Sequence, residues 1–348
     1  MPDPSSYPLS DHWDGERFFN PPETAPETYL PPVEPRIGDL SAPRLRKRRS
    51  RLAGIIRWRM ESRRVRWPRL PPDPPPAGDP HSVPPAGAIS VTFIGHSSFL
   101  LRLPGLSVLT DPIFSERCSP LSWVGPKRAR PPGRALEDLP RVDLVLLSHN
   151  HYDHMDLPSL AAIAKRDRPQ VATPLGNARH LDRMGFAALH EADWWQEIPL
   201  PGGDKISITP ARHFSSRTLW DRGRALWGGF MLEMEGKRIL YAGDSGHGTH
   251  WRQIGQRLGP PDLALLPIGA YDPRSIMAPV HTNPREAVAA HQALGARRSI
   301  GMHFGTFQLT DEAIDAPVIA LDEARRAAGL EREAFLTLGF GETHLFSL

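Results

Sequence analysis

The sequence predicts an α+β domain that follows an N-terminal extension. Short β-rich runs separated by glycine or proline come first in the domain, and helical patterns alternate with strands in its second half. Apolar residues make up 40% of the 348 residues, which is enough for a sizeable core. The first 87 residues hold 19 of the 39 prolines, many of them in a stiff linker over residues 71–85. We therefore expect an extension over residues 1–87 and a globular domain over residues 88–348.

The extension begins with an arm in which aromatic residues stand between prolines. His12-Trp13 and Phe18-Phe19 form this aromatic cluster. Because proline fixes φ and removes a backbone donor, we expect an extended arm rather than a helix. The aromatic side chains predict that the arm packs against another surface, such as that of the domain.

A strongly basic segment follows the arm. Residues 44–69 hold twelve Lys or Arg and one acidic residue, and the rest of the chain has a net charge of −8. A helix over residues 44–66 would have an apolar face surrounded by arginines, the pattern of a helix that lies on an anionic membrane surface. A helix packed on its own domain explains the pattern equally well. Nucleic-acid binding explains it less well.

Within the domain, the expected elements follow from hydrophobic periodicity and turn residues. Strands are expected at residues 89–94, 99–103, 107–109, 142–147, 171–173, 187–189, 206–209, 230–234, 238–241, 263–268, 299–302, 335–338 and 344–346. Helices are expected at residues 158–165, 251–258, 284–294 and 319–328. The helix at 284–294 has a clear start, because Asn283 is a capping residue and Glu286 stands three residues later.

The apolar run Val142 to Leu147 ends in a cluster of polar residues that suits a metal. The next seven residues read Ser-His-Asn-His-Tyr-Asp-His. His149 and His151 are two apart, so both rings can point the same way from an extended loop. Asp153 and His154 lie further along and can serve a second ion. Imidazole and carboxylate ligands suit zinc, and manganese or iron is compatible with the same set.

Three single polar residues each follow a predicted strand in the same manner. His213 comes after the strand at 206–209, Asp244 after 238–241, and His303 after 299–302. Ligands placed just past strand ends are typical of a site built at the edge of packed sheets. With the cluster described above, they predict a dinuclear metal site.

These motifs resemble those of the metallo-β-lactamase-fold hydrolases, whose signature is His-x-His-x-Asp-His after a hydrophobic strand. Flanking segments narrow the resemblance to the N-acyl-phosphatidylethanolamine phospholipase D branch. They are residues 93–98, 109–114, 125–128, 217–220 and 302–307. The resemblance covers roughly residues 88–348. It implies a four-layer αββα sandwich, whereas periodicity alone indicates only mixed α and β structure.

The resemblance also implies two zinc ions per chain and their ligands. It assigns His149, His151 and His213 to one ion, and Asp153, His154 and His303 to the other. Asp244 would bridge the two ions, so Asp153 and Asp244 would take part in catalysis as ligands. Two dications lower the pKa of a shared water, which then acts as the nucleophile near neutral pH.

Other residues are expected to support the reaction around the metals. By resemblance, His281 occupies the position of a general acid, and a surface histidine beside a helix cap is the alternative. Asp111 and Asp156 are candidates to accept the second N–H of metal-bound histidines, with turn or cap roles as the alternative.

Four residues are candidates for contact with the substrate. Lys127, Arg128 and Arg217 stand in segments shared with the phospholipase branch and could bind phosphate, although each could equally be a solvated charge. Trp227 could line a groove for acyl chains, and core packing is the alternative.

The reaction implied by the resemblance is zinc-dependent hydrolysis of a phosphodiester. The substrate would be N-acyl-phosphatidylethanolamine or a related glycerophosphodiester. Three alternatives stay open: a lactonase or carboxylic-ester hydrolase of the ascorbate-lactonase-like branch, an RNA-processing nuclease, and a non-catalytic binding module.

Location and partners follow from what the sequence contains. Cys118 is the single cysteine, so no intrachain disulfide forms, and we expect a reducing, cytoplasmic compartment. No apolar run approaches the roughly 20 residues of a membrane span. We expect peripheral contact with the inner face of a membrane through residues 44–69, little role for nucleic acid, and, by resemblance, a homodimer.

Overall fold

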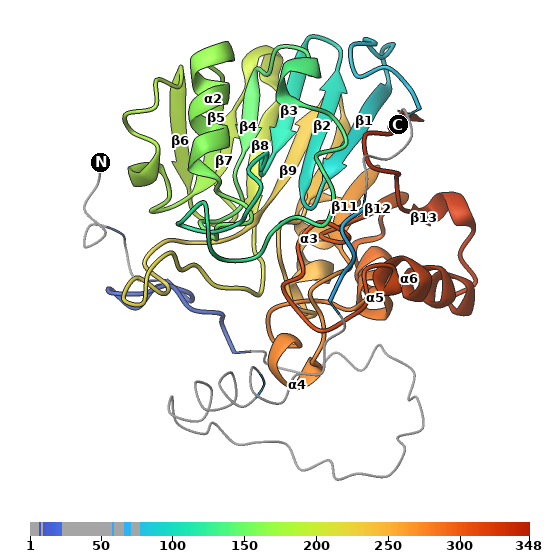
Figure 1. Cartoon of the computed structure of the whole chain (residues 1–348). Coiled ribbons are helices and arrows are strands. Elements are labelled where there is room, and N and C mark those ends of the chain that lie inside the picture. Colours follow the sequence, from blue (N-terminus) through green and yellow to red (C-terminus); the bar gives the residue numbers. More distant parts are fainter. Residues whose placement is uncertain (1–6, 8–9, 23–57, 59–65, 71–76) are drawn as a thin grey trace.

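Two seven-stranded sheets pack face to face in the computed structural model, which describes residues 7, 10–22, 58, 66–70 and 77–348 (Figure 1). The first sheet contains, in spatial order, β14 (Thr343–Ser347), β1 (Ala88–Gly95), β2 (Ser98–Leu103), β3 (Leu106–Thr110), β4 (Leu144–Leu146), β5 (Gln170–Pro174) and β6 (Ala188–Ala192). The second contains β13 (Phe335–Leu336), β12 (Arg298–Met302), β11 (Leu263–Pro267), β10 (Lys237–Tyr241), β9 (Gly229–Met234), β8 (Lys205–Thr209) and β7 (Glu197–Pro199). The expected α+β sandwich is confirmed.

Helices cover the outer faces of the sheets. They are α2 (Leu157–Asp167), α3 (His250–Leu258), α4 (Arg274–Met277), α5 (Pro284–Leu294) and α6 (Ala316–Ala327). In Figure 1, α2 lies against the first sheet, and α3, α5 and α6 lie together beside the second. Among the described residues, no helix combines the length and apolarity needed to cross a membrane.

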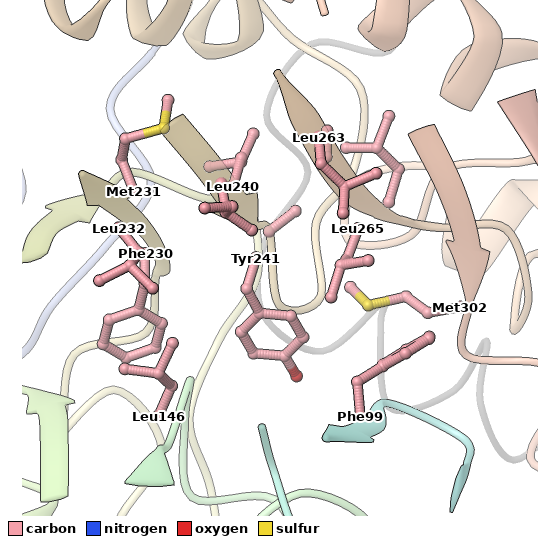
Figure 2. Packing of buried hydrophobic residues seen from close by; sticks show 14 of the residues in the cluster. Phe99, Leu146, Phe230, Met231, Leu232, Leu240, Tyr241, Leu263, Leu265 and Met302 are labelled. Atoms are coloured by element: carbon pink, nitrogen blue, oxygen red, sulfur yellow. The ribbon is translucent and has the colours of Figure 1, made fainter. Parts of the chain in front are cut away.

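Strand β4 is buried on both of its faces, which explains why the sequence is mostly apolar from Val142 to Leu147. Leu144 and Leu146 point into the core between the sheets, while Val145 and Leu147 point toward α2. Successive side chains of a strand face opposite sides, so a strand covered on both faces needs apolar residues at every position. Figure 2 shows Leu146 in this inter-sheet core, with Phe230 and Tyr241 from the second sheet.

The predicted elements all appear, although several of their bounds differ and some short elements were not predicted. The run 142–147 forms only the three-residue strand Leu144–Leu146, and the loop 148–154, which we call the metal-site loop, begins two residues after Leu146. Strand β7 and helix α4 were not predicted. They are three and four residues long, which is too short for a periodic pattern.

The aromatic arm packs on the domain, as predicted. His12, Trp13 and Phe18 are buried, and residues 10–22 contain no helix. The Phe18 amide donates a 2.7 Å hydrogen bond to the Gly223 carbonyl. Strand β1 begins at Ala88, but the division of the chain there stays a prediction, because the arm shares the domain's core.

The predicted basic helix over residues 44–66 lies outside the described residues, apart from Trp58 and Arg66. The Trp58 indole donates a 2.6 Å hydrogen bond to Asp311 Oδ2. Trp67, further along the chain, donates through its indole to the Glu312 carbonyl. Trp58 and Trp67 precede the predicted linker over residues 71–85. Their contacts attach them to Asp311 and Glu312, in the segment that follows Phe307.

Candidate metal centre

All the candidate ligands lie in loops that begin at or just past the ends of strands. These strands belong to both sheets, and their ends meet at one side of the sandwich. The loop 148–154 follows β4 of the first sheet, whereas His213, Asp244 and His303 follow β8, β10 and β12 of the second. Strained backbone concentrates at this edge: φ is 65° at His303 and 30° at Asp111. Positive φ is costly for non-glycine residues and persists where the surrounding structure holds it in place.

One group of donors consists of three histidines. Nε2 of His149 lies 2.8 Å from Nδ1 of His151, which lies 3.1 Å from Nε2 of His213. The three nitrogens lie within 4.8 Å of one another, so one ion could bind all three. This trio is the set expected for the first ion.

A second group combines histidines with a carboxylate. Oδ2 of Asp153 lies 3.5 Å from Nε2 of His154 and 3.5 Å from Nε2 of His303. His96 Nε2 is closer, at 3.0 Å from the same oxygen. The group therefore contains the three residues expected for the second ion, together with His96.

Asp244 lies between these two groups. Its Oδ2 atom is 3.1 Å from His303 Nε2, 3.2 Å from His154 Nε2 and 3.7 Å from His213 Nε2. One carboxylate oxygen is thus close to donors of both groups. This is the placement that a bridging ligand requires.

Burial and nearby carboxylates shift the pKa values of the donor histidines in different directions. Burial lowers the pKa of His151 to about 4 and that of His213 to about 3, and it holds the pKa of His149 well below its ordinary value. Burial also opposes charge on His303, but Asp244 and Asp153 outweigh it and raise the pKa of His303 to about 9. Carboxylates likewise raise the pKa of His154. Burial thus disfavours charge on the first trio, and it also lowers the pKa of His96 to about 3, whereas the carboxylates favour charge on His154 and His303.

Several buried polar atoms of the cluster fit a bound cation. Among the described residues, Nε2 of His154, Oδ1 of Asp244 and Nδ1 of His281 are buried without a hydrogen-bond partner. Leaving buried polar atoms unsatisfied is costly. Imidazole nitrogens and carboxylate oxygens grouped in this way are the donor set of zinc, manganese or iron sites.

Asp111 supports the cluster from behind, as expected. Its Oδ2 atom lies 2.6 Å from His154 Nδ1, which orients the ring so that Nε2 faces Asp244. The same carboxylate accepts a hydrogen bond from the Ser148 amide at 2.7 Å and another from the Tyr241 hydroxyl. Asp111 therefore connects β3, β10 and the metal-site loop.

His281 lies beside the cluster at the start of α5. Its Nδ1 atom is 3.9 Å from Asp244 Oδ2, and its side chain is 12% exposed. The loop is held in place because Arg274 donates to the His281 carbonyl at 2.8 Å and binds both carboxylate oxygens of Glu286. The predicted capping box between Asn283 and Glu286 is present. The alternative of a surface histidine does not hold, because the ring faces the metal ligands.

The expectation for Asp156 is wrong. Its Oδ2 atom accepts hydrogen bonds from the hydroxyls of Ser115 and Ser159, and it contacts no histidine of the cluster. Asp156 precedes α2, so its side chain connects that helix to the loop after β3. Its role is therefore local, as the alternative stated.

Arg128 and Trp227 are also unavailable to a substrate. The buried guanidinium of Arg128 donates to the carbonyls of Ser115 and Ile113. The Trp227 indole is 2% exposed and donates to the Ala211 carbonyl, so it packs in the core. Lys127 forms an ion pair with Glu116, and its side chain is 27% exposed.

Arg217 braces the metal-site loop instead of projecting into solvent. It donates to the carbonyls of Asn150 and Met155, at 2.9 and 2.8 Å, and its guanidinium lies 4.0 Å over the Tyr152 ring. The Tyr152 hydroxyl in turn donates to the Arg217 carbonyl. A role in phosphate binding is therefore not supported by its contacts.

Sequence reasoning missed the parts of the site that depend on long-range contacts. His96 was not among the expected ligands, yet it lies among the candidate ligands of the second group. The Tyr241 hydroxyl, at the end of β10, reaches Asp111. Tyr241 is a polar residue at the end of a predicted strand, and that position could have indicated a role in the site.

Comparison with known proteins agrees with this geometry. The family model of the β-lactamase superfamily domain matches residues 107–304. The chain is 38% identical over 279 residues to N-acyl-phosphatidylethanolamine-hydrolyzing phospholipase D 1 of Caenorhabditis elegans, covering 76% of this chain and 77% of that protein. It is 34% identical over 261 residues to the mitochondrial N-acyl-phosphatidylethanolamine-hydrolyzing phospholipase D of Saccharomyces cerevisiae. That match covers 73% of this chain and 55% of the yeast protein.

A solved structure shares the fold. Igni18, a metallo hydrolase from the archaeon Ignicoccus hospitalis, superposes with a TM-score of 0.56 at 26% sequence identity. The superposition covers 75% of this chain and 99% of the archaeal one.

Proposed function

The chain belongs to the β-lactamase superfamily of metal-dependent hydrolases, and we propose that it is a dinuclear zinc phosphodiesterase of phospholipase D type. The proposed substrate is N-acyl-phosphatidylethanolamine or a related glycerophosphodiester. The names of the Caenorhabditis elegans and Saccharomyces cerevisiae relatives support this substrate class.

The position of Asp244 carries the proposal. Its Oδ2 atom lies within 3.2 Å of His154 and His303 Nε2 and 3.7 Å from His213 Nε2. A carboxylate between two donor groups suits two neighbouring dications, because its negative charge reduces their repulsion. When bound, the ions would supply an activated water and electrostatic stabilisation of the phosphodiester oxygens.

The ligand roles follow from the two donor groups. His149, His151 and His213 would hold one ion, and Asp153, His154 and His303 the other. His96 would hold Asp153 through its 3.0 Å contact, and Asp111 would hold His154.

His281 is proposed to move the proton. Burial lowers the pKa of the ring, whereas the Asp244 charge favours its protonated form. Nδ1 has no hydrogen-bond partner among the described residues and lies 3.9 Å from Asp244 Oδ2, so the ring could take the proton that the attacking water loses. The ring then gives a proton to the leaving alkoxide, whose own basicity would otherwise prevent its departure.

The decisive experiment combines metal content with hydrolysis of bis(p-nitrophenyl) phosphate. We expect about two zinc ions per chain, the stoichiometry of a two-metal site. Asp244→Asn should reduce both metal content and activity. His281→Ala should keep the metal and lose roughly 10²–10⁴-fold in kcat, the usual contribution of proton transfer. His344→Ala, which removes an exposed histidine from β14, is the matched control and should change neither.

Two results would contradict the proposal. A wild-type protein with two metal ions that cleaves no diester would favour the lactonase reaction instead. A wild-type protein that binds no metal would contradict the ligand assignment itself. If the diester is cleaved, headgroup choice is then tested with N-acyl-phosphatidylethanolamine and phosphatidylcholine in mixed micelles.

A further inference from the structure

Ser148 stands between β4 and the candidate ligand His149, and the proposed function gives it no role. It is fully buried. Its amide donates a 2.7 Å hydrogen bond to Asp111 Oδ1, and its carbonyl accepts one from the Gly228 amide at 3.2 Å. The backbone alone therefore anchors this residue to the end of β3 and the start of β9, and its hydroxyl is left for another task.

The Ser148 hydroxyl lies between a candidate ligand ring and a carboxylate. Its Oγ atom is 2.9 Å from Nδ1 of His149, and the hydroxyl donates a hydrogen bond to Oδ2 of Asp111. A hydroxyl has a single hydrogen to donate. Because that hydrogen is directed to Asp111, the contact with His149 is one in which Nδ1 donates and the serine oxygen accepts.

A proton on Nδ1 leaves the other ring nitrogen of His149 available to a cation. A neutral imidazole has one N–H and one lone pair, so this tautomer places the lone pair on Nε2. Nε2 of His149 is the atom that faces the first trio, 2.8 Å from Nδ1 of His151. The Ser148 hydroxyl thus selects the tautomer in which His149 can bind an ion together with His151 and His213.

Asp111 contacts the second group through the same carboxylate oxygen. Its Oδ2 atom also lies 2.6 Å from Nδ1 of His154, whose Nε2 faces Asp244. One buried carboxylate therefore reaches a ligand ring of each donor group, His154 directly and His149 through Ser148. Hydrogen bonds to an ionised acceptor are stronger than those between neutral groups, and the members of a hydrogen-bonded chain polarise one another.

We propose that Ser148 is a positioning residue that links Asp111 to His149, so that a single carboxylate orients one ligand of each metal ion. The proposal rests on the ligand assignment of the proposed function. It separates the effects of two residues, because Ser148 acts on the first ion alone and Asp111 acts on both. A hydrogen-bond partner behind a metal-binding histidine fixes its tautomer and raises its basicity.

The test measures the zinc affinity of each donor group separately, by competition with a chromophoric chelator. His303→Ala removes a ligand of the second group, so the first trio holds the tighter ion, and His151→Ala does the converse. In the His303→Ala protein, Ser148→Ala should weaken zinc binding about 10–100-fold, the usual effect of losing such a partner. In the His151→Ala protein, Ser148→Ala should change the affinity little, whereas Asp111→Asn should weaken binding in both proteins.

Two variants of equal shape separate the hydroxyl from packing. Ser148→Thr keeps the hydroxyl and Ser148→Val replaces it with a methyl group, and both add the same branch to a side chain that lies close to Gly243. In the otherwise wild-type protein, one of the two zinc affinities should be at least about tenfold higher for Ser148→Thr than for Ser148→Val. Ser347→Ala removes an exposed hydroxyl from β14 and should change neither affinity.

Three results would overturn the proposal. The first is an unchanged affinity of the first trio after Ser148→Ala, and the second is equal zinc binding by Ser148→Thr and Ser148→Val. The third is an equal loss at both donor groups after Ser148→Ala, which would show that the serine holds the whole loop and not His149. A wild type that binds no zinc would contradict the ligand assignment and the proposal with it. Zinc binding needs no turnover, so a protein with these affinities that cleaves no diester would contradict only the proposed reaction.

Discussion

At the scale of single residues, Asp111 organises the metal cluster although it is not itself an expected ligand. Its carboxylate orients His154 and accepts hydrogen bonds from Ser148 and Tyr241. Burial raises the pKa of the Tyr241 hydroxyl well above its ordinary value, and the nearby Asp111 charge raises it further. The hydroxyl thus stays protonated and donates. A carboxylate behind a metal-binding histidine fixes its tautomer and raises its basicity.

Asp111→Asn is therefore expected to weaken metal binding by about 10–100-fold, the usual effect of losing such a partner. Competition with a chromophoric chelator measures the affinity directly. Asp138→Asn changes an exposed aspartate in the same way and should have no effect. Equal affinity of the Asp111→Asn variant and the wild type would show that His154 is oriented by other contacts.

At the scale of elements, the arm of residues 10–22 is part of the site's support. The Asn20 side chain donates a 3.0 Å hydrogen bond to the carbonyl of His213, and Arg212 donates to the Pro21 carbonyl. The His12 ring stacks on Trp194, with 4.2 Å between ring centroids, and lies 2.7 Å from Asp193 Oδ1. The arm thus holds the segment that carries one candidate ligand.

Docking of the arm should weaken as pH rises. Burial opposes charge on His12, but hydrogen bonds to Asp193 and Asp11 outweigh it, so its pKa is raised. A group with a raised folded pKa stabilises the fold fully below its unfolded pKa, about 6.5 for histidine, and loses that contribution as pH rises through the folded value.

The stability difference between wild type and His12→Asn should consequently shrink as pH rises above about 6.5, the ordinary histidine pKa. Thermal unfolding at several pH values measures it, and limited proteolysis reports release of the arm. His81→Asn, in an exposed position, is the control. If the stability difference between wild type and His12→Asn does not change with pH, the charge on His12 does not contribute to its contact with Asp193.

At the scale of the whole molecule, the core between the sheets positions the site. Leu146 is fully buried there, and the metal-site loop begins two residues later. Figure 2 shows its side chain facing Phe230 of the opposite sheet. Packing between the sheets thereby fixes the distance between the ligands of β4 and those of β8, β10 and β12.

Leu146→Ala should lower the free energy of unfolding by about 2–5 kcal/mol, the range for large-to-small changes in a core. Urea denaturation in the presence of a chelator measures it without a contribution from bound metal. Leu345→Ala, at a position 55% exposed in β14, should stay within about 0.5 kcal/mol of wild type. A similar effect of both changes would argue against a close-packed inter-sheet core.

The sequence by itself determined the class of fold, nearly all of the elements and the positions of the candidate ligands. These features are local: strands and helices follow from periodicity, and the ligands were recognised because each stands just past an apolar run. His149, His213, Asp244 and His303 come from four strand ends, and packing of the sheets brings those ends together. The family resemblance supplied the sandwich that periodicity could not.

Only the tertiary structure decided what the supporting residues do. Arg128, Arg217 and Trp227 looked available to a substrate, yet their polar atoms are used on backbone carbonyls. Asp111 and Asp156 were both candidates to hold a metal-bound histidine, and only Asp111 contacts a histidine of the cluster. A charged or aromatic residue faces solvent or a buried carbonyl according to contacts between distant segments, which no local pattern encodes.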